Sequence, residues 1–229
     1  IFRPLAMVSS GYDVSATLLP KRASGYEPTP DGDSYINAPY LDMSIPYAAG
    51  SLYSTVEDLY RWDRALYLDT LLPAPLKQRM FTAGLNQYAF GWRVEPTKLD
   101  DGKTVLTTMG HSGGINGFSS YIIRATDKKE VVIVLDNTSR GGRIQELAGG
   151  ILSILHDIPP RQPRKLVAET LWALLAKGHV AEAIKTYRAL KVQKPTEYNF
   201  SSPGELNGLG YRLMVQGRLA DAIELFKLN

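Results

Sequence analysis

The amino-acid sequence predicts an α+β fold in which helices flank an antiparallel sheet, followed by an extension of α-helical hairpins. Four strand-like runs follow one another between residues 88 and 135, with connections too short for parallel neighbours. Helical periodicity precedes and follows these runs, and beyond residue 164 the sequence is purely helical and repeats itself. We therefore expect one domain over residues 1–158 and a helical one over residues 164–229.

The composition of the 229 residues excludes several classes of protein. A net charge of +3 without any block of Lys or Arg gives no basis for nucleic-acid binding. The absence of cysteine excludes a disulfide scaffold, a thiolate metal site and a cysteine nucleophile. The longest apolar runs are far too short to span a bilayer, so no membrane span is expected.

The first part of the chain is predicted to be a long, ordered surface loop that leads into a helix. Residues 1–50 are rich in Pro and Gly, which favour turns over regular structure. Ser54 and Glu57 have the spacing of a capping box, which predicts a helix beginning at Ser54. A shorter helix is expected after Pro73 and Pro75.

The sheet and the helix after it follow from hydrophobic periodicity and turn residues. The four predicted strands are Tyr88–Glu95, Thr104–Met109, Phe118–Arg124 and Glu130–Leu135. A helix is expected from about Gly142 to His156, because apolar residues recur there on one face. The residues of that face are Ile144, Leu147, Ala148, Ile151 and Leu155.

The helical extension contains an internal repeat. Residues 177–184 recur as residues 216–223, and each unit reads as helix, glycine turn, helix. This pattern resembles the tetratricopeptide hairpin, a family of interaction scaffolds, although the period is longer than usual for that family. Two such hairpins bury little core, so we expect them to dock on the first domain, to dimerise, or to continue beyond Asn229.

The segment Gly110–Phe118 has the residue types of a substrate-binding strand. It places His111 and Ser112 on a strand and then three glycines within five residues. Glycines weaken a strand and are tolerated where a ligand must approach the backbone closely. Such an edge could pair with a peptide-like substrate and direct an amide at an oxyanion. The alternative reading of the same residues is a tight turn between two strands.

This motif and four other segments resemble the serine β-lactamase-like hydrolases, which include class C β-lactamases, D-alanyl-D-alanine carboxypeptidases and related esterases. The other segments are Ile1–Met7, Tyr47–Leu59, Phe90–Trp92 and Val131–Asn137. The resemblance implies part of a β-lactamase/transpeptidase-like fold over residues 1 to about 157. It also implies a periplasmic or secreted location, although the chain shows no signal peptide. No cofactor is expected, and no metal either, because His156 and His179 have no acidic or histidine partners at ligand spacing.

The resemblance also implies roles for five residues. His111 takes the basic position of the family's third motif and is the catalytic candidate. Ser112 would donate a hydrogen bond to a substrate carboxylate or carbonyl, and Gly113 would let the substrate lie on the strand. The N–H of Gly114 would be one oxyanion donor, and Arg143 would add positive charge near a substrate carboxylate.

Two elements of the family pattern are missing from their expected places. The chain contains no Ser-x-x-Lys, the motif that supplies the acylated serine and its lysine. Tyr35-Ile36-Asn37 spells the Tyr-x-Asn motif, but it follows the Pro-Leu-Ala-Met segment instead of preceding it, and we interpret it as a coincidence. We therefore expect both groups upstream of Ile1, which would make the chain the C-terminal part of a catalytic domain. The truncated face could then contact a partner chain.

Two functional hypotheses follow. In the first, the chain is part of a serine hydrolase that forms an acyl-enzyme with a β-lactam, a D-alanyl peptide or a small ester. A His in the third motif favours esterase or peptidase chemistry, and the substrate is a small molecule or peptide-like. In the second, the chain is a non-catalytic binding module whose helical repeat captures a protein partner.

Overall fold

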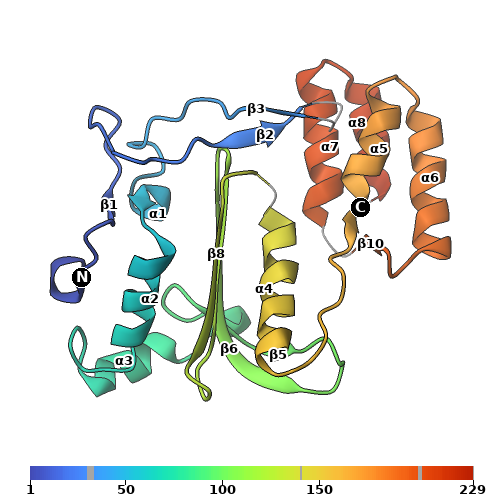
Figure 1. Cartoon of the computed structure of the whole chain (residues 1–229). Coiled ribbons are helices and arrows are strands. Elements are labelled where there is room, and N and C mark those ends of the chain that lie inside the picture. Colours follow the sequence, from blue (N-terminus) through green and yellow to red (C-terminus); the bar gives the residue numbers. More distant parts are fainter. Residues whose placement is uncertain (30–33, 140, 201–202, 229) are drawn as a thin grey trace. The chain divides into compact units, whose positions relative to one another are not determined.

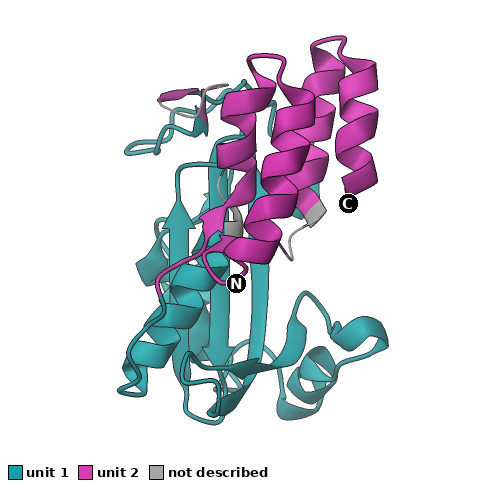
Figure 2. Ribbon diagram, turned by 90° about the vertical axis from the view of Figure 1, so that its right-hand side faces the viewer, with its two compact units in different colours: residues 1–27, 37–161 teal, residues 28–36, 162–229 magenta. Residues whose placement is uncertain are grey.

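The computed structural model describes residues 1–29, 34–139, 141–200 and 203–228. The chain folds as two compact units, coloured separately in Figure 2. Unit 1 consists of residues 1–27 and 37–161, and unit 2 of residues 28–36 and 162–229. Each unit has its own apolar core.

The centre of unit 1 is a four-stranded antiparallel sheet, which confirms the predicted α+β fold. Its strands, in spatial order, are β5 (Arg93–Lys98), β6 (Val105–Ile115), β7 (Phe118–Ala125) and β8 (Glu130–Asp136). The predicted start of the first strand at Tyr88 is wrong, because left-handed backbone at Gly91 interrupts the extended chain between Tyr88 and Arg93. The second strand is longer than predicted and runs through the glycine-rich motif.

Helices cover both faces of the sheet, as Figure 1 shows for α2 (Val56–Ala65) and α4 (Gly141–Leu155). Trp92 lies in the core on the face of α2 and α3 (Ala74–Phe81), and α3 is the predicted shorter helix. The other core holds Ala148 and Leu152 of α4. Two residues of the predicted α4 stripe, Leu147 and Leu155, are about half exposed, because the buried stripe runs through residue 152 instead.

The remaining elements before β5 are short. β1 (Gly11–Tyr12) pairs antiparallel with β4 (Leu52–Tyr53). The others are two turns of 3-10 helix, two three-residue strands and one four-residue helix: η1 (Arg3–Leu5), η2 (Leu85–Gln87), β2 (Tyr26–Pro28), β3 (Tyr35–Asn37) and α1 (Tyr47–Gly50).

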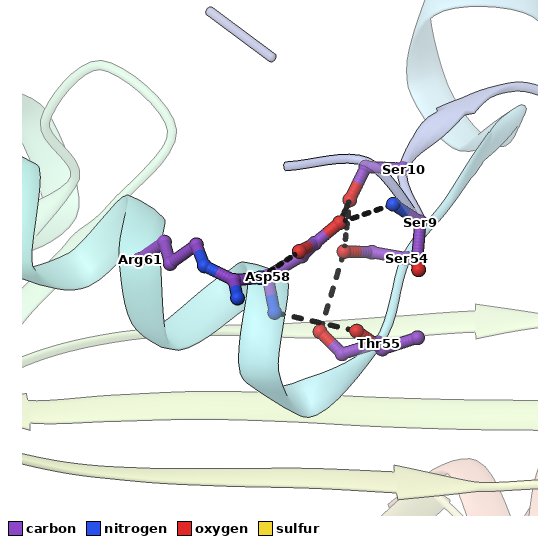
Figure 3. A network of polar contacts seen from close by, with 6 residues as sticks. All are labelled: Ser9, Ser10, Ser54, Thr55, Asp58 and Arg61. Atoms are coloured by element: carbon purple, nitrogen blue, oxygen red, sulfur yellow. Dashed lines mark hydrogen bonds and ion pairs between the residues drawn. The ribbon is translucent and has the colours of Figure 1, made fainter. Parts of the chain in front are cut away.

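The helix cap of α2 lies one residue later than predicted. Thr55, not Ser54, is the N-cap, and its hydroxyl accepts a hydrogen bond from the N–H of Asp58 at 3.3 Å. The Ser54 hydroxyl instead lies 2.7 Å from the hydroxyl of Ser10 (Figure 3). The sequence pattern could not show this choice, because Ser10 comes from a segment distant in sequence.

Asp58 ties the N-terminal segment to α2. Its carboxylate is 1% exposed and accepts hydrogen bonds from the Ser9 N–H and the Ser10 hydroxyl, both at 2.8 Å, and from Arg61 at 2.5 Å (Figure 3). Burial favours a raised pKa, but these three hydrogen bonds and the Arg61 charge outweigh it and hold the pKa of Asp58 below its ordinary value.

Asp58 should therefore make the stability of unit 1 acid-sensitive. A carboxyl with a depressed folded-state pKa stabilises the fold above its unfolded pKa of about 3.9, and this stabilisation is lost as pH falls through the folded pKa. We expect Asp58→Asn to lower the free energy of unfolding at neutral pH by about 1–3 kcal/mol. The loss should shrink in acid.

Urea unfolding at neutral pH and at several acidic values checks this expectation. A Trp172→Phe background limits tryptophan fluorescence to Trp62 and Trp92, which both belong to unit 1. Asp127→Asn, at an exposed turn carboxyl, is the control and should change little. An Asp58→Asn protein with the acid dependence of the wild type would contradict the assignment.

In the part of unit 2 that the structure describes, four helices form two hairpins around one core. They are α5 (Val167–Leu175), α6 (Val180–Gln193), α7 (Pro203–Val215) and α8 (Leu219–Leu228). Gly178 and Gly217 occupy equivalent turns with φ of 84° and 75°, a left-handed conformation that favours glycine. A parallel pair of two-residue strands, β9 (Lys165–Leu166) and β10 (Tyr198–Asn199), completes the unit. Among the helices of the described residues, none combines the length and apolar character that crossing a membrane requires.

Candidate active site

Strand β6 has an open edge at the predicted motif. β6 pairs with β7 as far as Ile115, but its pairing with β5 ends at Gly110, opposite Arg93. Within the part of the chain that the structure describes, residues 111–115 thus have a strand partner on one side alone. Residues 111–114 are all exposed. We call residues 111–115 the open edge; unpaired main-chain groups of this kind are available to an extended ligand.

The two glycines of the open edge differ in the room that they leave for a side chain. A Cβ at Gly113 would lie 2.4 Å from the hydroxyl of Ser120, so any other residue there would force that hydroxyl to move. A Cβ at Gly114 would meet no atom within 4 Å. The space beside Gly114 is therefore empty, and its backbone is accessible to a ligand.

The ring of His111 is held by two hydrogen bonds. Its Nδ1 lies 2.6 Å from the main-chain carbonyl of Ser112, and its Nε2 lies 2.7 Å from the hydroxyl of Tyr88. A carbonyl only accepts, so Nδ1 carries the proton in the neutral ring and Nε2 accepts from Tyr88. The two rings also meet edge to face, with centroids 5.8 Å apart.

Tyr88 is a site residue that sequence reasoning missed. The sequence placed it in a strand, whereas it lies in a loop between η2 and β5. No motif spacing links Tyr88 to His111, and only the folded chain brings them together. The two residues of the motif itself project to opposite faces, because His111 pairs with Ile122 and Ser112 with Tyr121.

Two cavities flank the motif. The first, of about 190 Å³, includes His111 and Ser112 in its lining, and the second, of about 340 Å³, includes Gly114. The remaining lining of the first is Tyr88, Arg93, Glu95, Thr108, Gly110, Tyr121 and Gln145. The remaining lining of the second is Glu27, Ile115, Asn116, Phe118, Ser119 and Ser139.

Tyr121 is the hydroxyl whose ionisation the first cavity perturbs. Burial, assisted by the Glu95 charge and opposed by Arg93, raises the pKa of Tyr121 above its ordinary value. Its phenol thus resists ionisation further into the alkaline range than an exposed tyrosine does.

Arg143 and the Tyr-x-Asn sequence lie apart from these cavities. Arg143 is in the first turn of α4, is partly buried, and lines neither cavity, whereas Gln145 of the same helix lines the first. A role for Arg143 toward a substrate carboxylate stays a prediction. Tyr35–Asn37 forms the exposed strand β3 and lines neither cavity.

The described residues contain no group of three or more His, Asp or Glu side chains that could hold a metal ion. The motif itself offers the imidazole of His111, the hydroxyls of Ser112 and Tyr88, and the open main chain of residues 113 and 114.

Comparison with known proteins gives a consistent result. The family model described as Beta-lactamase matches residues 1–155. PbpX of Bacillus subtilis (strain 168), named among the penicillin-binding proteins, is 26% identical over 158 residues, which are 68% of this chain and 37% of that protein. Penicillin-binding protein 4* of the same organism is 34% identical over 94 residues, or 38% of this chain and 20% of that protein.

Solved structures agree on the fold. The D-stereospecific amidohydrolase from Streptomyces sp. superimposes with a TM-score of 0.51 at 25% identity, covering 63% of this chain and 44% of that one. FmtA from Staphylococcus aureus gives 0.52 at 17% identity, covering 71% and 42%. The chain thus spans less than half the length of the relatives that it matches.

Proposed function

The chain belongs to the beta-lactamase family, and from that membership we propose that it forms one wall of the active site of a serine hydrolase that works through an acyl-enzyme. The observation that supports this most is the open edge, an exposed strand segment bare of side chains at Gly113 and Gly114. The nucleophilic serine and the tyrosine of the family pattern would come from chain before Ile1. The lack of Ser-x-x-Lys and the partial coverage of the relatives support that proposal.

In the proposed reaction the serine hydroxyl attacks a substrate carbonyl that lies against the open edge. The Gly114 N–H would donate to the oxyanion of the tetrahedral intermediate, where a fixed main-chain donor contributes most. The serine proton would pass to the leaving group through the tyrosine of the family pattern, and His111 would support that proton network through its hydrogen bonds. Ser112 would donate to a carboxylate or carbonyl of the substrate from the first cavity.

The substrate class that we propose is a β-lactam, a D-alanyl peptide or a small ester. Each presents an acyl carbon beside a segment that can lie along a strand, which suits an edge lined by glycines. A histidine in place of a lysine at the third-motif position favours the peptide and ester substrates.

A second function, protein capture by unit 2, has its own support. Trp172 and Leu175 of the first hairpin are 2% and 0% exposed. The residues at the equivalent positions of the second hairpin, Tyr211 and Met214, are 61% and 41% exposed. A tetratricopeptide-like repeat buries such positions by stacking the next unit, so this face of α7 is the candidate interaction surface.

Activity-based labelling tests the enzymatic proposal. A longer protein that includes the residues before Ile1, incubated with a fluorophosphonate or a fluorescent penicillin, should be labelled on a serine upstream of Ile1. The 229-residue chain alone should stay unlabelled. Removal of residues 164–229 should keep the labelling wherever unit 1 still folds. Absence of labelling by both reagents, together with absence of ester hydrolysis, would refute the proposal and leave the binding function.

A further inference from the structure

We propose that Tyr88 is a positioning residue, which fixes the orientation and the tautomer of His111 so that Nε2 is its basic nitrogen. This inference deepens the proposed function, because it assigns which nitrogen of the third-motif histidine carries the proton and which one accepts a hydrogen bond. Tyr88 acts through His111 and is not itself assigned to contact the substrate.

The hydrogen-bond pattern determines the tautomer. The Ser112 carbonyl at 2.6 Å from Nδ1 can only accept, so the proton of a neutral ring stays on that nitrogen. The lone pair of Nε2 then needs a donor, and the Tyr88 hydroxyl lies 2.7 Å away. With only one of these hydrogen bonds the ring could still rotate, whereas the two together define one ring orientation.

The backbone around Tyr88 is itself held in place. The Tyr88 carbonyl accepts from the Gly84 N–H at 2.9 Å, and its own N–H donates to the Leu85 carbonyl at 3.2 Å. The two residues before it, Asn86 and Gln87, have φ of 55° and 59°, a left-handed conformation that Asn adopts more readily than Gln. The two main-chain hydrogen bonds hold the turn from which the Tyr88 phenol reaches His111.

The packing between the two rings adds a geometric constraint. Their planes meet at 70° with centroids 5.8 Å apart, an edge-to-face arrangement that aromatic rings favour. Phenylalanine at position 88 would keep this contact and lose only the hydroxyl. Tyr88→Phe therefore isolates the hydrogen bond from the packing.

Nitrogen NMR of the histidine rings tests the proposal in the 229-residue chain. In protein labelled with ¹⁵N-histidine, at pH of about 9 where imidazoles are ordinarily neutral, His111 should show a protonated Nδ1 and an unprotonated Nε2. Tyr88→Phe should move the Nε2 resonance of His111 toward that of a nitrogen without a hydrogen-bond donor. His156 and His179, the other two histidines, should not change.

Tyr121→Phe is the matched control. It removes another hydroxyl from the lining of the same cavity and should leave the His111 resonances in place. A wild-type His111 protonated on Nε2 would overturn the proposal without recourse to any variant. An unchanged Nε2 resonance in Tyr88→Phe would also overturn it. The measurement uses no substrate, so its failure is distinguishable from failure of the serine-hydrolase proposal, which labelling of the longer protein decides.

Discussion

Asp63→Ala is expected to destabilise unit 1 by about 3–5 kcal/mol, because it leaves a buried guanidinium without its carboxylate. Asp63 is 0% and Arg124 1% exposed, and the Arg124 Nε lies 2.5 Å from the Asp63 carboxylate. The guanidinium also lies over the rings of Tyr67, Phe81 and Trp92, which exclude water from the pair. Removal of the Asp63 carboxylate therefore leaves the Arg124 cation unneutralised in an apolar site, where the pair had joined α2 to β7.

Urea unfolding in the Trp172→Phe background measures this loss. The double variant Asp63→Ala/Arg124→Met should recover much of it, because both charges are then absent. Asp69→Ala, which breaks the pair between Lys77 and a 67%-exposed carboxylate, is the surface control and should cost less than about 1 kcal/mol. An Asp63→Ala protein no less stable than Asp69→Ala would contradict the assignment of the buried pair.

Gly114→Pro in the longer protein is expected to slow acyl-enzyme formation by about 10²–10³-fold. Proline has no N–H, so the substitution removes the donor that we assign to the oxyanion. Single-turnover labelling with a fluorophosphonate measures the rate. Tryptophan fluorescence checks that unit 1 stays folded.

Gly114→Ala is the matched control for this prediction. Alanine keeps the N–H, and a Cβ at this position meets no protein atom within 4 Å, so the fold should tolerate it and its rate should stay well above that of the proline variant. Equal rates for the alanine and proline variants would show that the Gly114 N–H is not an oxyanion donor.

Hydrophobic period and connection length sufficed to predict the antiparallel sheet and the helices. The connections between β6 and β7 and between β7 and β8 are too short for any other pairing, and the glycine turns of unit 2 recur in sequence. The prediction failed where a residue distant in sequence determines a local contact. At the N-terminus of α2, Asp58 is bonded by Ser10, which comes from a different segment of the chain.

The candidate site was predictable only in part for the same reason. Residues 111–114 form one continuous motif, and the structure places them together on the open edge. Tyr88 is 23 positions from His111, in a loop shaped by positive φ angles that no sequence pattern at this position signals. Arg143 was chosen by resemblance, and the structure brings Gln145 rather than Arg143 to the lining of the first cavity.

A crystal structure of the longer protein with a phosphonate bound to its serine tests most directly whether the exposed strand segment is the acyl-transfer wall. The predicted result is a phosphonyl oxygen within hydrogen-bond distance of the Gly114 N–H, with the ligand extended along residues 112–114. A phosphonate seated on a serine away from this strand, with Gly114 facing only solvent, would contradict it.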